Sequence, residues 1–547
     1  MTEVAENTRA GVAEPGSNGA ELAIDTLVAN GVDTVFGIPG VHTLALYDAL
    51  HDRPVRHILA RHEQGAGFMA DGYARASGKP GVALIITGPG ITNVATPIGE
   101  AYTDGSPVFV VSANVEREYL DAMRGNLHDL KDQRGVMAAV TQWNTRVMDP
   151  ADAPAAIAEG LTRLTNGRTR PVHVELPLDV LDEPVSGSVD LPRITAVRSP
   201  ALSEAIDRAV ELITGANRVV IYAGGGAVVS ANPEALLAIA ERLSAPIVTS
   251  VMGKGAVPED HPLVLGATWD AGNVVDQLWS EADLALVVGS KLGAQTTRMF
   301  KLRYPEQMIR IDIDEEEMTR NVCPSVPLLG DAAETLSALA NALEARDVRL
   351  ESFPRERIAQ VKRDAVANAW GADRDPYIQA IRRAVPRDGI TVWDMTMMAY
   401  VAQARFPVYE PRTYIFPSGY GTLGFSLPVA LGAKVACPDK AVVAVIGDGG
   451  YQFTMAELAT AVQFELTVPI VIFDDSTYSA VKDAQLESRD GRYIAVDLVN
   501  PDFLKLADAY GVPGVRPETP EALEAEITAA LRRTGPTIIN TPIPGWV

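Results

Sequence analysis

The chain has 547 residues and a formal net charge of −23, from 47 Lys and Arg against 70 Asp and Glu. This acidic balance argues against a nucleic-acid partner, because phosphate-backbone binders need a positively charged surface. Its two cysteines, Cys323 and Cys437, are too few for a disulfide framework or a cysteine-rich zinc site. Apolar runs such as Val82–Ile86 are too short to span a bilayer, and the polar N-terminus lacks a signal-peptide pattern. We expect a cytoplasmic protein without membrane contacts and with about three domains, since a domain typically has roughly 100–200 residues.

The first predicted domain covers residues 18–185, where short β-branched runs alternate with longer helical stretches. Strands that alternate with helices are typical of parallel sheets built from βαβ units. Residues 1–17 have almost nothing to bury and are expected to form a disordered tail. The strand-like runs of this domain are Thr34–Phe36, Val82–Ile86, Val108–Val111 and Val172–Leu176.

Two further domains of the same kind follow, at residues 196–345 and 375–547. A Pro-, Ser- and Gly-containing stretch after Glu183 predicts the linker that precedes them. No period of about 20–50 residues is present, which excludes a solenoid. The predicted fold class is α/β, with three doubly wound parallel-sheet domains. The strand-like runs are Arg218–Tyr222, Ile247–Thr249, Leu284–Val288 and Met308–Asp312, then Thr391–Trp393, Ala441–Ile446, Ile470–Phe473 and Thr537–Asn540.

The segment with the clearest chemistry is 442–479. An apolar strand runs into Gly447–Gly450, a helical stretch follows, and a second apolar strand ends at Asp474 and Asp475. Glycines directly after a strand let a phosphate approach the backbone, and a carboxylate at the same turn can hold a hard cation. Asp448 and Asp475 are 27 residues apart, so right-handed βαβ closure predicts both at one edge of the sheet. An ordinary glycine turn, with the aspartates as helix N-caps, is the alternative.

This segment resembles the thiamine diphosphate (ThDP) motif of the pyruvate decarboxylase/acetolactate synthase superfamily. The likeness is Gly447-Asp448-Gly449 followed, after 24 residues, by a polar pair, although the family has Asn-Asn where this chain has Asp474-Asp475. The resemblance implies that Asp448 and Asp475 bind Mg²⁺ through their side chains and Thr477 through its backbone carbonyl. The cofactor contacts that it implies here are Gly447, Asp448, Gly449, Gly450, Asp475, Thr477 and Tyr478.

A second segment resembles the pyrimidine-binding domain of the same superfamily. It contains Arg61-His62-Glu63-Gln64, after a strand-like run from Val55, and Thr87-Gly88-Pro89-Gly90-Ile91-Thr92-Asn93. The resemblance implies that Glu63 hydrogen-bonds N1′ of the cofactor's aminopyrimidine and so activates the cofactor. Considered alone, Glu63 is better explained as a solvated carboxylate that a helix N-terminus favours. The cofactor contacts implied for this domain are Pro39, Gly88 and Asn93.

The segment Gly419–Phe425 resembles the family's loop that bends the cofactor into its V shape. The likeness implies that Leu423 is the apolar wedge under the two rings and that the Gly421 carbonyl accepts a hydrogen bond from N4′. Thr396 is an implied diphosphate contact, although the Gln-His of acetolactate synthases is missing from its segment. A buried leucine at an ordinary helix entry is the alternative for Leu423.

Gly37–Leu50 and Gly125–Gln133 resemble the acetolactate synthase-like branch, which includes 5-guanidino-2-oxopentanoate (2-ketoarginine) decarboxylases. The resemblance implies that His128 donates a proton near the reacting carbon, with His42 beside it. Surface-loop histidines are the alternative. On the predicted helix after the metal loop, Gln485 and Glu487 are the candidates to reach the substrate.

The resemblance as a whole implies a ThDP- and Mg²⁺-dependent enzyme that cleaves the C–C bond beside the carbonyl of a 2-oxo acid, as a decarboxylase or a carboligase. A 2-hydroxyacyl-CoA lyase and a non-catalytic ThDP-binding paralogue are the alternatives. Because the family's glutamate and metal loop come from different subunits, a homodimer or homotetramer is implied. Gly224-Gly225-Gly226 follows a predicted strand without a full dinucleotide motif, so FAD is possible but not favoured.

Overall fold

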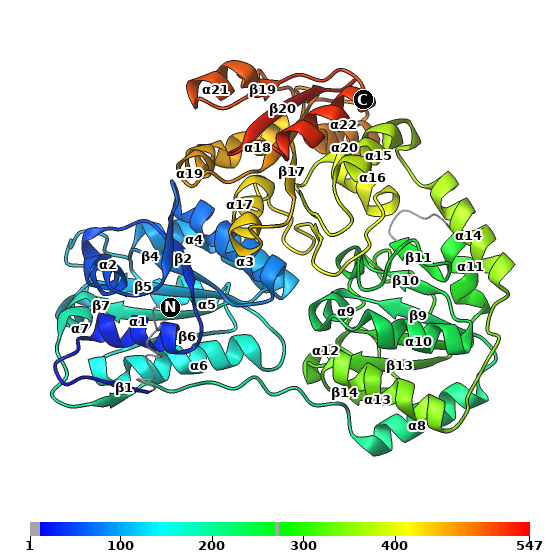
Figure 1. Cartoon of the computed structure of the whole chain (residues 1–547), viewed down its shortest axis with the longest axis horizontal. Helices are drawn as coiled ribbons and strands as arrows, with labels where there is room; N and C mark the ends of the chain where they lie inside the picture. The colour runs from blue at the N-terminus through cyan, green and yellow to red at the C-terminus, as the bar shows by residue number, and fades with distance from the viewer. Residues whose placement is uncertain (1–10, 268–272, 547) are drawn as a thin grey trace, which may run out of the picture. The chain divides into compact units, whose positions relative to one another are not determined.

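The computed structural model describes residues 11–267 and 273–546. Its contacts divide the chain into two compact units, Met1–Val197 and Arg198–Val547. The described residues form three six-stranded sheets, one in the first unit and two in the second, and helices pack against each sheet (Figure 1). All neighbouring strands in these three sheets run parallel. The predicted α/β class with three parallel-sheet domains is therefore confirmed.

The sheet of the first unit has the strand order β3-β2-β4-β5-β7-β6. From β2 the chain passes first to β3 on one side and then across to β4 on the other. At such a switch point the loops at the carboxyl ends of the strands diverge and leave a crevice. The strands are β2 (Thr34–Gly37), β3 (Arg56–Leu59), β4 (Gly81–Ile85), β5 (Val108–Asn114), β6 (Trp143–Arg146) and β7 (Val172–Pro177). The helices are α1 (Gly19–Ala29), α2 (Leu44–His51), α3 (Glu63–Ser77), α4 (Pro89–Asp104), α5 (Gln133–Ala138), α6 (Ala153–Thr165) and α7 (Leu178–Asp182).

The end of the predicted N-terminal tail pairs with the rest of the first unit. Residues 1–10 lie outside the described residues, but β1 (Val12–Ala13) runs antiparallel to β8 (Val189–Asp190). The Gly16 N–H also donates to the Val185 carbonyl at 2.9 Å. Backbone hydrogen bonds hold this segment in place. The prediction of a disordered tail considered only how few apolar side chains the segment has, and so it missed these bonds.

The central sheet has the order β11-β10-β9-β12-β13-β14. The glycine run after β9 packs against the loop after β12: the Gly226 N–H donates to the Gly289 carbonyl at 2.9 Å, and a Cβ on Gly224 would lie 2.3 Å from that carbonyl oxygen. The strands are β9 (Val219–Ala223), β10 (Ile247–Thr249), β11 (Val264–Ala267), β12 (Leu284–Val288), β13 (Gln307–Asp312) and β14 (Val326–Leu329). The helices are α8 (Ser203–Gly215), α9 (Gly225–Ser230), α10 (Pro233–Leu243), α11 (Asn273–Glu281), α12 (Glu315–Arg320), α13 (Ala332–Ala345) and α14 (Arg355–Asn368).

The third sheet has the order β16-β15-β17-β18-β20-β19, with its switch point between β15 and β17. Its central strands are buried on both faces, as their continuous apolar sequences predict. The strands are β15 (Ile390–Trp393), β16 (Tyr414–Ile415), β17 (Val442–Gly447), β18 (Pro469–Asp474), β19 (Gly514–Val515) and β20 (Thr537–Pro542). The helices are α15 (Asp375–Ala384), α16 (Met397–Arg405), α17 (Ser426–Ala436), α18 (Asp448–Thr454), α19 (Leu458–Gln463), α20 (Ser479–Arg489), α21 (Phe503–Ala509) and α22 (Pro520–Ala530).

Within the second unit, a buried ion pair of the central segment contacts the loop that precedes β16. The Lys254 ammonium group donates to Glu259 Oε1 at 2.8 Å, and Glu259 Oε2 accepts from the Val408 N–H at 3.1 Å. Gly255, at φ +84°, packs against the Glu410 carbonyl, where a Cβ would lie 2.4 Å away. These contacts fix the two sheets of this unit beside each other. Separately, none of the helices in the described residues has both the length and the apolar character that a membrane crossing requires.

Candidate active site

Three carboxylates meet at the carboxyl ends of β17 and β18. The two strands are parallel neighbours with Gly447 opposite Phe473, so Asp448 follows one strand while Asp474 ends the other. Asn500 bridges them: its amide nitrogen donates to Asp448 Oδ2 at 2.5 Å and to Asp474 Oδ1 at 3.0 Å. Asp475 comes next and accepts a hydrogen bond from the Ser479 hydroxyl. The sequence did not single out Asn500, which lies on a loop far along the chain.

None of these carboxylates forms an ion pair with a cationic side chain within the described residues. Burial and, to a smaller extent, the charge of Asp475 raise the pKa of Asp448 to about 6. Burial also raises the pKa of Asp475. The nearby Lys482 pairs with Asp497 instead, at 2.8 Å. Buried carboxylates without a cationic partner are stabilised by a hard divalent cation, which prefers oxygen ligands.

The predicted third metal ligand lies on the turn after β18. Thr477 forms an isolated bridge with Asp497, and the ring of the next residue, Tyr478, packs so closely on Gly449 that a Cβ there would lie 2.5 Å from Cε1. Within residues 11–267 and 273–546, no group of three or more His, Cys, Asp and Glu side chains is arranged as a metal site. The predicted set is of another kind, because it combines two carboxylates with one backbone carbonyl.

Two helix N-termini face the switch point of the third sheet. Thr396 precedes α16 and makes no side-chain hydrogen bond to that helix end, while Gly447 precedes α18. A Cβ on Gly447 would lie 3.2 Å from Thr396 Oγ1, and one on Gly450 would lie 3.0 Å from an oxygen of Asp394. Free backbone N–H groups at helix N-termini bind phosphate groups. The glycines at this crevice therefore leave room for the diphosphate that the motif predicts.

Asp394 fixes the loop that carries Leu423. Its buried carboxylate accepts hydrogen bonds from the backbone N–H groups of Met395 at 2.9 Å, Gly424 at 3.2 Å and Ser426 at 2.8 Å. Burial raises its pKa to about 6, although these donors oppose the shift. Leu423 itself is half-buried. Asp394 is a second positioning residue that the sequence did not reveal, and its only signal is an acidic residue directly after an apolar strand.

In the first unit, Glu63 lies at the beginning of α3, where β3 has ended. The Asn93 amide donates to Glu63 Oε2 at 2.9 Å. Burial and the Glu63 charge both raise the pKa of the Tyr47 hydroxyl. Two predicted residues of this domain, Glu63 and Asn93, are thus brought together by α3 and α4, while Pro39 is exposed in the loop after β2.

The two histidines of the first unit stack on each other. The rings of His42 and His128 are 5.1 Å apart at an interplanar angle of 26°, and the Nδ1 atom of each is buried without a hydrogen bond in the described part of the chain. His128 adopts φ +66°, and its carbonyl oxygen would lie 2.5 Å from a Cβ on Gly88. Burial, and then the neighbouring imidazole, lower the pKa of His42. His128 is therefore half-buried, in a loop beside the predicted pyrimidine segment.

The two candidates on α20 are placed differently from each other. The Gln485 amide bonds to the backbone of Ile494 at both ends, donating at 3.1 Å and accepting at 3.0 Å. Glu487 is exposed on the same helix. Gln485 thus holds the loop after α20, whereas Glu487 makes no hydrogen bond or ion pair within the described residues.

Comparison with known proteins finds three family models along the chain. They are described as the thiamine pyrophosphate enzyme N-terminal TPP binding domain, central domain and C-terminal TPP binding domain, and they match residues 17–136, 206–339 and 394–541. Over 531 residues the chain is 41% identical to a probable 2-ketoarginine decarboxylase, AruI, of Pseudomonas aeruginosa, covering 95% of this chain and 93% of that protein. It is 34% identical to a probable acetolactate synthase large subunit of Methanocaldococcus jannaschii, with 96% and 92% covered. It is 33% identical to the acetolactate synthase isozyme 3 large subunit of Escherichia coli, with 94% and 92% covered.

Proposed function

Because this chain belongs to the thiamine pyrophosphate enzyme family, we propose that it is a ThDP- and Mg²⁺-dependent decarboxylase of a 2-oxo acid. The observation that carries the proposal is the 41% identity, over 95% of the chain, with a protein named as a 2-ketoarginine decarboxylase. We therefore take 2-ketoarginine as the first candidate substrate. A carboligase of the acetolactate synthase type is the second candidate, supported by the relatives at 34% and 33% identity.

The residues of the third domain fit this cofactor. When bound, ThDP supplies a carbon nucleophile for the 2-oxo carbonyl and accepts the electrons that CO₂ leaves behind. Asp448, Asp475 and the Thr477 carbonyl would hold Mg²⁺, whose charge offsets that of the uncompensated carboxylates. Thr396 and the N–H groups at Gly447–Gly450 would bind the diphosphate.

Other residues would orient the rings and move protons. Leu423 on the loop fixed by Asp394 would support the two rings, and the Gly421 carbonyl would accept a hydrogen bond from the aminopyrimidine. Glu63, which Asn93 orients, would share a proton with the pyrimidine nitrogen. His128 would deliver a proton to the product carbon, and we keep Glu487 as a candidate substrate contact.

Magnesium binding is expected to weaken in acid. Since the pKa of Asp448 is raised to about 6, its carboxyl is protonated below that pH and Mg²⁺ must displace the proton. The apparent affinity should be constant above about pH 7 and should fall by up to about tenfold per pH unit below about pH 6. Titration of Mg²⁺ into the protein with saturating ThDP, at about pH 5 and about pH 7.5, measures this. Equal affinities at both pH values would remove Asp448 from the metal site.

We expect His128→Ala to lower kcat by more than it raises KM. An imidazole can donate a proton near neutral pH, and proton delivery contributes about 10²–10⁴-fold to rate. Steady-state kinetics give kcat and KM, and a single-turnover experiment with CO₂ and aldehyde measured separately should show aldehyde release slowed more than CO₂ release. His51→Ala is the control, because His51 is exposed and pairs with Asp52. If only KM rises, His128 binds substrate, and unchanged kinetics would leave it without a role in the reaction.

A panel of substrates distinguishes the candidate activities. With ThDP and Mg²⁺ added, a decarboxylase releases one CO₂ and one aldehyde per 2-oxo acid, whereas a carboligase consumes two 2-oxo acids per CO₂. Aldehyde release from a 2-hydroxyacyl-CoA without CO₂ would identify a lyase instead. Bound ThDP without turnover of any compound would identify a non-catalytic paralogue.

We further propose a homodimer or homotetramer that does not require FAD. The family's distribution of glutamate and metal loop over two subunits supports the oligomer, and its molar mass in solution tests it. The packing of Gly224–Gly226 on Gly289 supports the proposal that FAD is not required, because this packing accounts for the glycine run without a bound nucleotide. Cofactor extraction from the purified protein tests it.

A further inference from the structure

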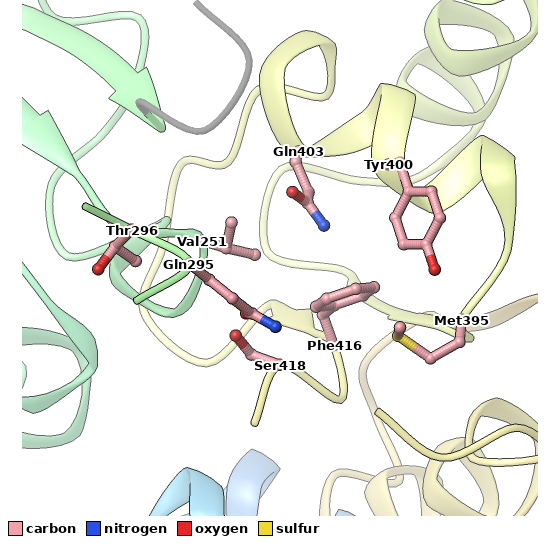
Figure 2. A pocket seen from close by; sticks show the side chains of 8 residues that line it. All are labelled: Val251, Gln295, Thr296, Met395, Tyr400, Gln403, Phe416 and Ser418. Carbon is pink, nitrogen blue, oxygen red and sulfur yellow. The ribbon is translucent and has the colours of Figure 1, made fainter. Parts of the chain in front are cut away.

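A cavity of about 80 Å³ lies within the second unit, between loops of the central segment and α16 of the third domain. Figure 2 shows its lining side chains, with the amides of Gln295 and Gln403 extending toward the space beside the ring of Phe416. A water molecule needs only roughly 10–15 Å³ of such volume, so the cavity has room for several non-hydrogen atoms of a ligand. The functions derived above make no use of it.

The cavity borders the loop that is expected to carry the cofactor's rings. Met395 lines it and also lies beside Gly421, where a Cβ would be 3.4 Å from Met395 Cε. Met395 directly follows Asp394, whose carboxylate holds Gly424 and Ser426. A substrate whose carbonyl reacts next to this loop can therefore extend its side chain past Met395 into the cavity.

The lining includes the amide of Gln403, which has no hydrogen-bond partner in the described part of the chain. Gln403 is only 2% exposed, yet its side chain makes no hydrogen bond within residues 11–267 and 273–546. Burying such a group unpaired costs about 1–3 kcal/mol, so buried amides are normally satisfied by protein, water or ligand. Gln403 lines the cavity, and Figure 2 shows its amide directed toward that space, where water or a ligand can satisfy it.

The electrostatics of the cavity disfavour an anion. The lining contains amide, hydroxyl, thioether and apolar groups but no Lys or Arg to pair with a carboxylate. Negative charge acts on one lining residue, because Asp394 adds to burial in raising the pKa of Tyr400. Phe416 offers an aromatic ring, on which a weakly hydrated guanidinium group can stack.

We propose that this cavity binds the side chain of the 2-oxo acid and that Gln403, through its amide oxygen, selects a side chain that ends in a guanidinium group. The inference rests on the proposed decarboxylation and adds the place where the rest of the substrate is recognised. Gln295 contributes a second amide from the opposite wall, and Phe416 contributes the stacking surface.

The test replaces Gln403 by a residue of similar size without the amide. Gln403→Leu should lower kcat/KM for 2-ketoarginine by about 10- to 100-fold, the effect of one hydrogen bond to a charged group. With the apolar 4-methyl-2-oxopentanoate, kcat/KM should stay equal or rise. Gln360→Leu is the matched control. Gln360 lies on α14, outside the cavity, and its amide nitrogen donates a hydrogen bond to Asp364. It should change neither value.

An unchanged ratio of the two kcat/KM values in Gln403→Leu would overturn the inference, and so would an equal loss with both substrates. Gln295→Leu, on the exposed wall of the cavity, is the second variant if Gln403→Leu does not fold, and its expected loss is selective in the same way. Failure of the proposed function is distinguishable, since the wild type would then release no CO₂ from any 2-oxo acid. In that case calorimetric titration with unreactive 4-guanidinobutyrate decides: binding lost in Gln403→Leu supports the cavity assignment, and equal or absent binding in the wild type and variant overturns it.

Discussion

Glu63→Gln is expected to keep ThDP binding and to lose most turnover. The change replaces a carboxylate by an amide of equal size, so the hydrogen bond with Asn93 at 2.9 Å can persist through the remaining oxygen. What is lost is the group that can share a proton with the pyrimidine, and such acid–base assistance contributes about 10²–10⁴-fold. The decisive measurement is hydrogen–deuterium exchange at the reactive carbon of bound ThDP, in parallel with kcat.

The control separates this role from that of an ordinary helix-end carboxylate. Glu521 lies in the first turn of α22, as Glu63 lies in the first turn of α3. Glu521→Gln therefore loses the same favourable interaction with a helix N-terminus, worth about 0.3–1 kcal/mol, without approaching the site. It should leave exchange and turnover unchanged. Exchange as fast in Glu63→Gln as in the wild type would show that Glu63 only stabilises its helix.

Asp448→Ala should abolish cofactor binding at ordinary ThDP concentrations, whereas Asp475→Asn should be tolerated. Asp448 lies directly after β17 and is bridged by Asn500 to Asp474, so its removal takes away a metal ligand and unties the edge of the sheet. We expect a loss of more than about 100-fold, because changes to the partners of metal ligands alone already cost about 10–100-fold. In Asp475→Asn the side-chain oxygen can still accept from the Ser479 hydroxyl and still ligate the cation.

Titration of ThDP with saturating Mg²⁺, followed by tryptophan fluorescence, measures both variants. Asp474→Asn is the matched control, since Asp474 is a bonding partner of Asn500 and not a predicted ligand. It should bind ThDP within a fewfold of the wild type. A severe loss in Asp475→Asn would reveal a requirement for the second negative charge, and normal binding in Asp448→Ala would contradict the metal site.

The strands in the middle of each sheet could be predicted from the sequence, but most edge strands could not. Central strands such as β5 and β17 are buried on both faces and therefore form continuous apolar runs. The edge strand β6 has the sequence WNTR with no fully buried residue, and β16 and β19 have two residues each. These strands depend on backbone pairing with a neighbour, which leaves no periodic signal in their own side chains.

Some residues of the candidate site could likewise be predicted from the sequence, and others could not. Asp448, Gly449 and Glu63 stand in local motifs, so sequence alone singled them out. The roles of Asp394 and Asn500 depend on partners that are distant in sequence: Asn500 and Asp448, for example, are 52 positions apart. The role proposed for Gln403 depends on the cavity beside it. Only the folded chain brings such groups together, because parallel strands gather their carboxyl ends at one edge of a sheet.

The most direct test of the account is cofactor-dependent decarboxylation of 2-ketoarginine by the intact protein. The protein, stripped of ThDP and metal, is assayed for CO₂ and aldehyde after addition of ThDP alone, Mg²⁺ alone and both together. The account predicts that only the combination restores activity, with one CO₂ and one aldehyde formed per 2-ketoarginine consumed. No CO₂ from 2-ketoarginine or any other 2-oxo acid, with both cofactors bound, would contradict it.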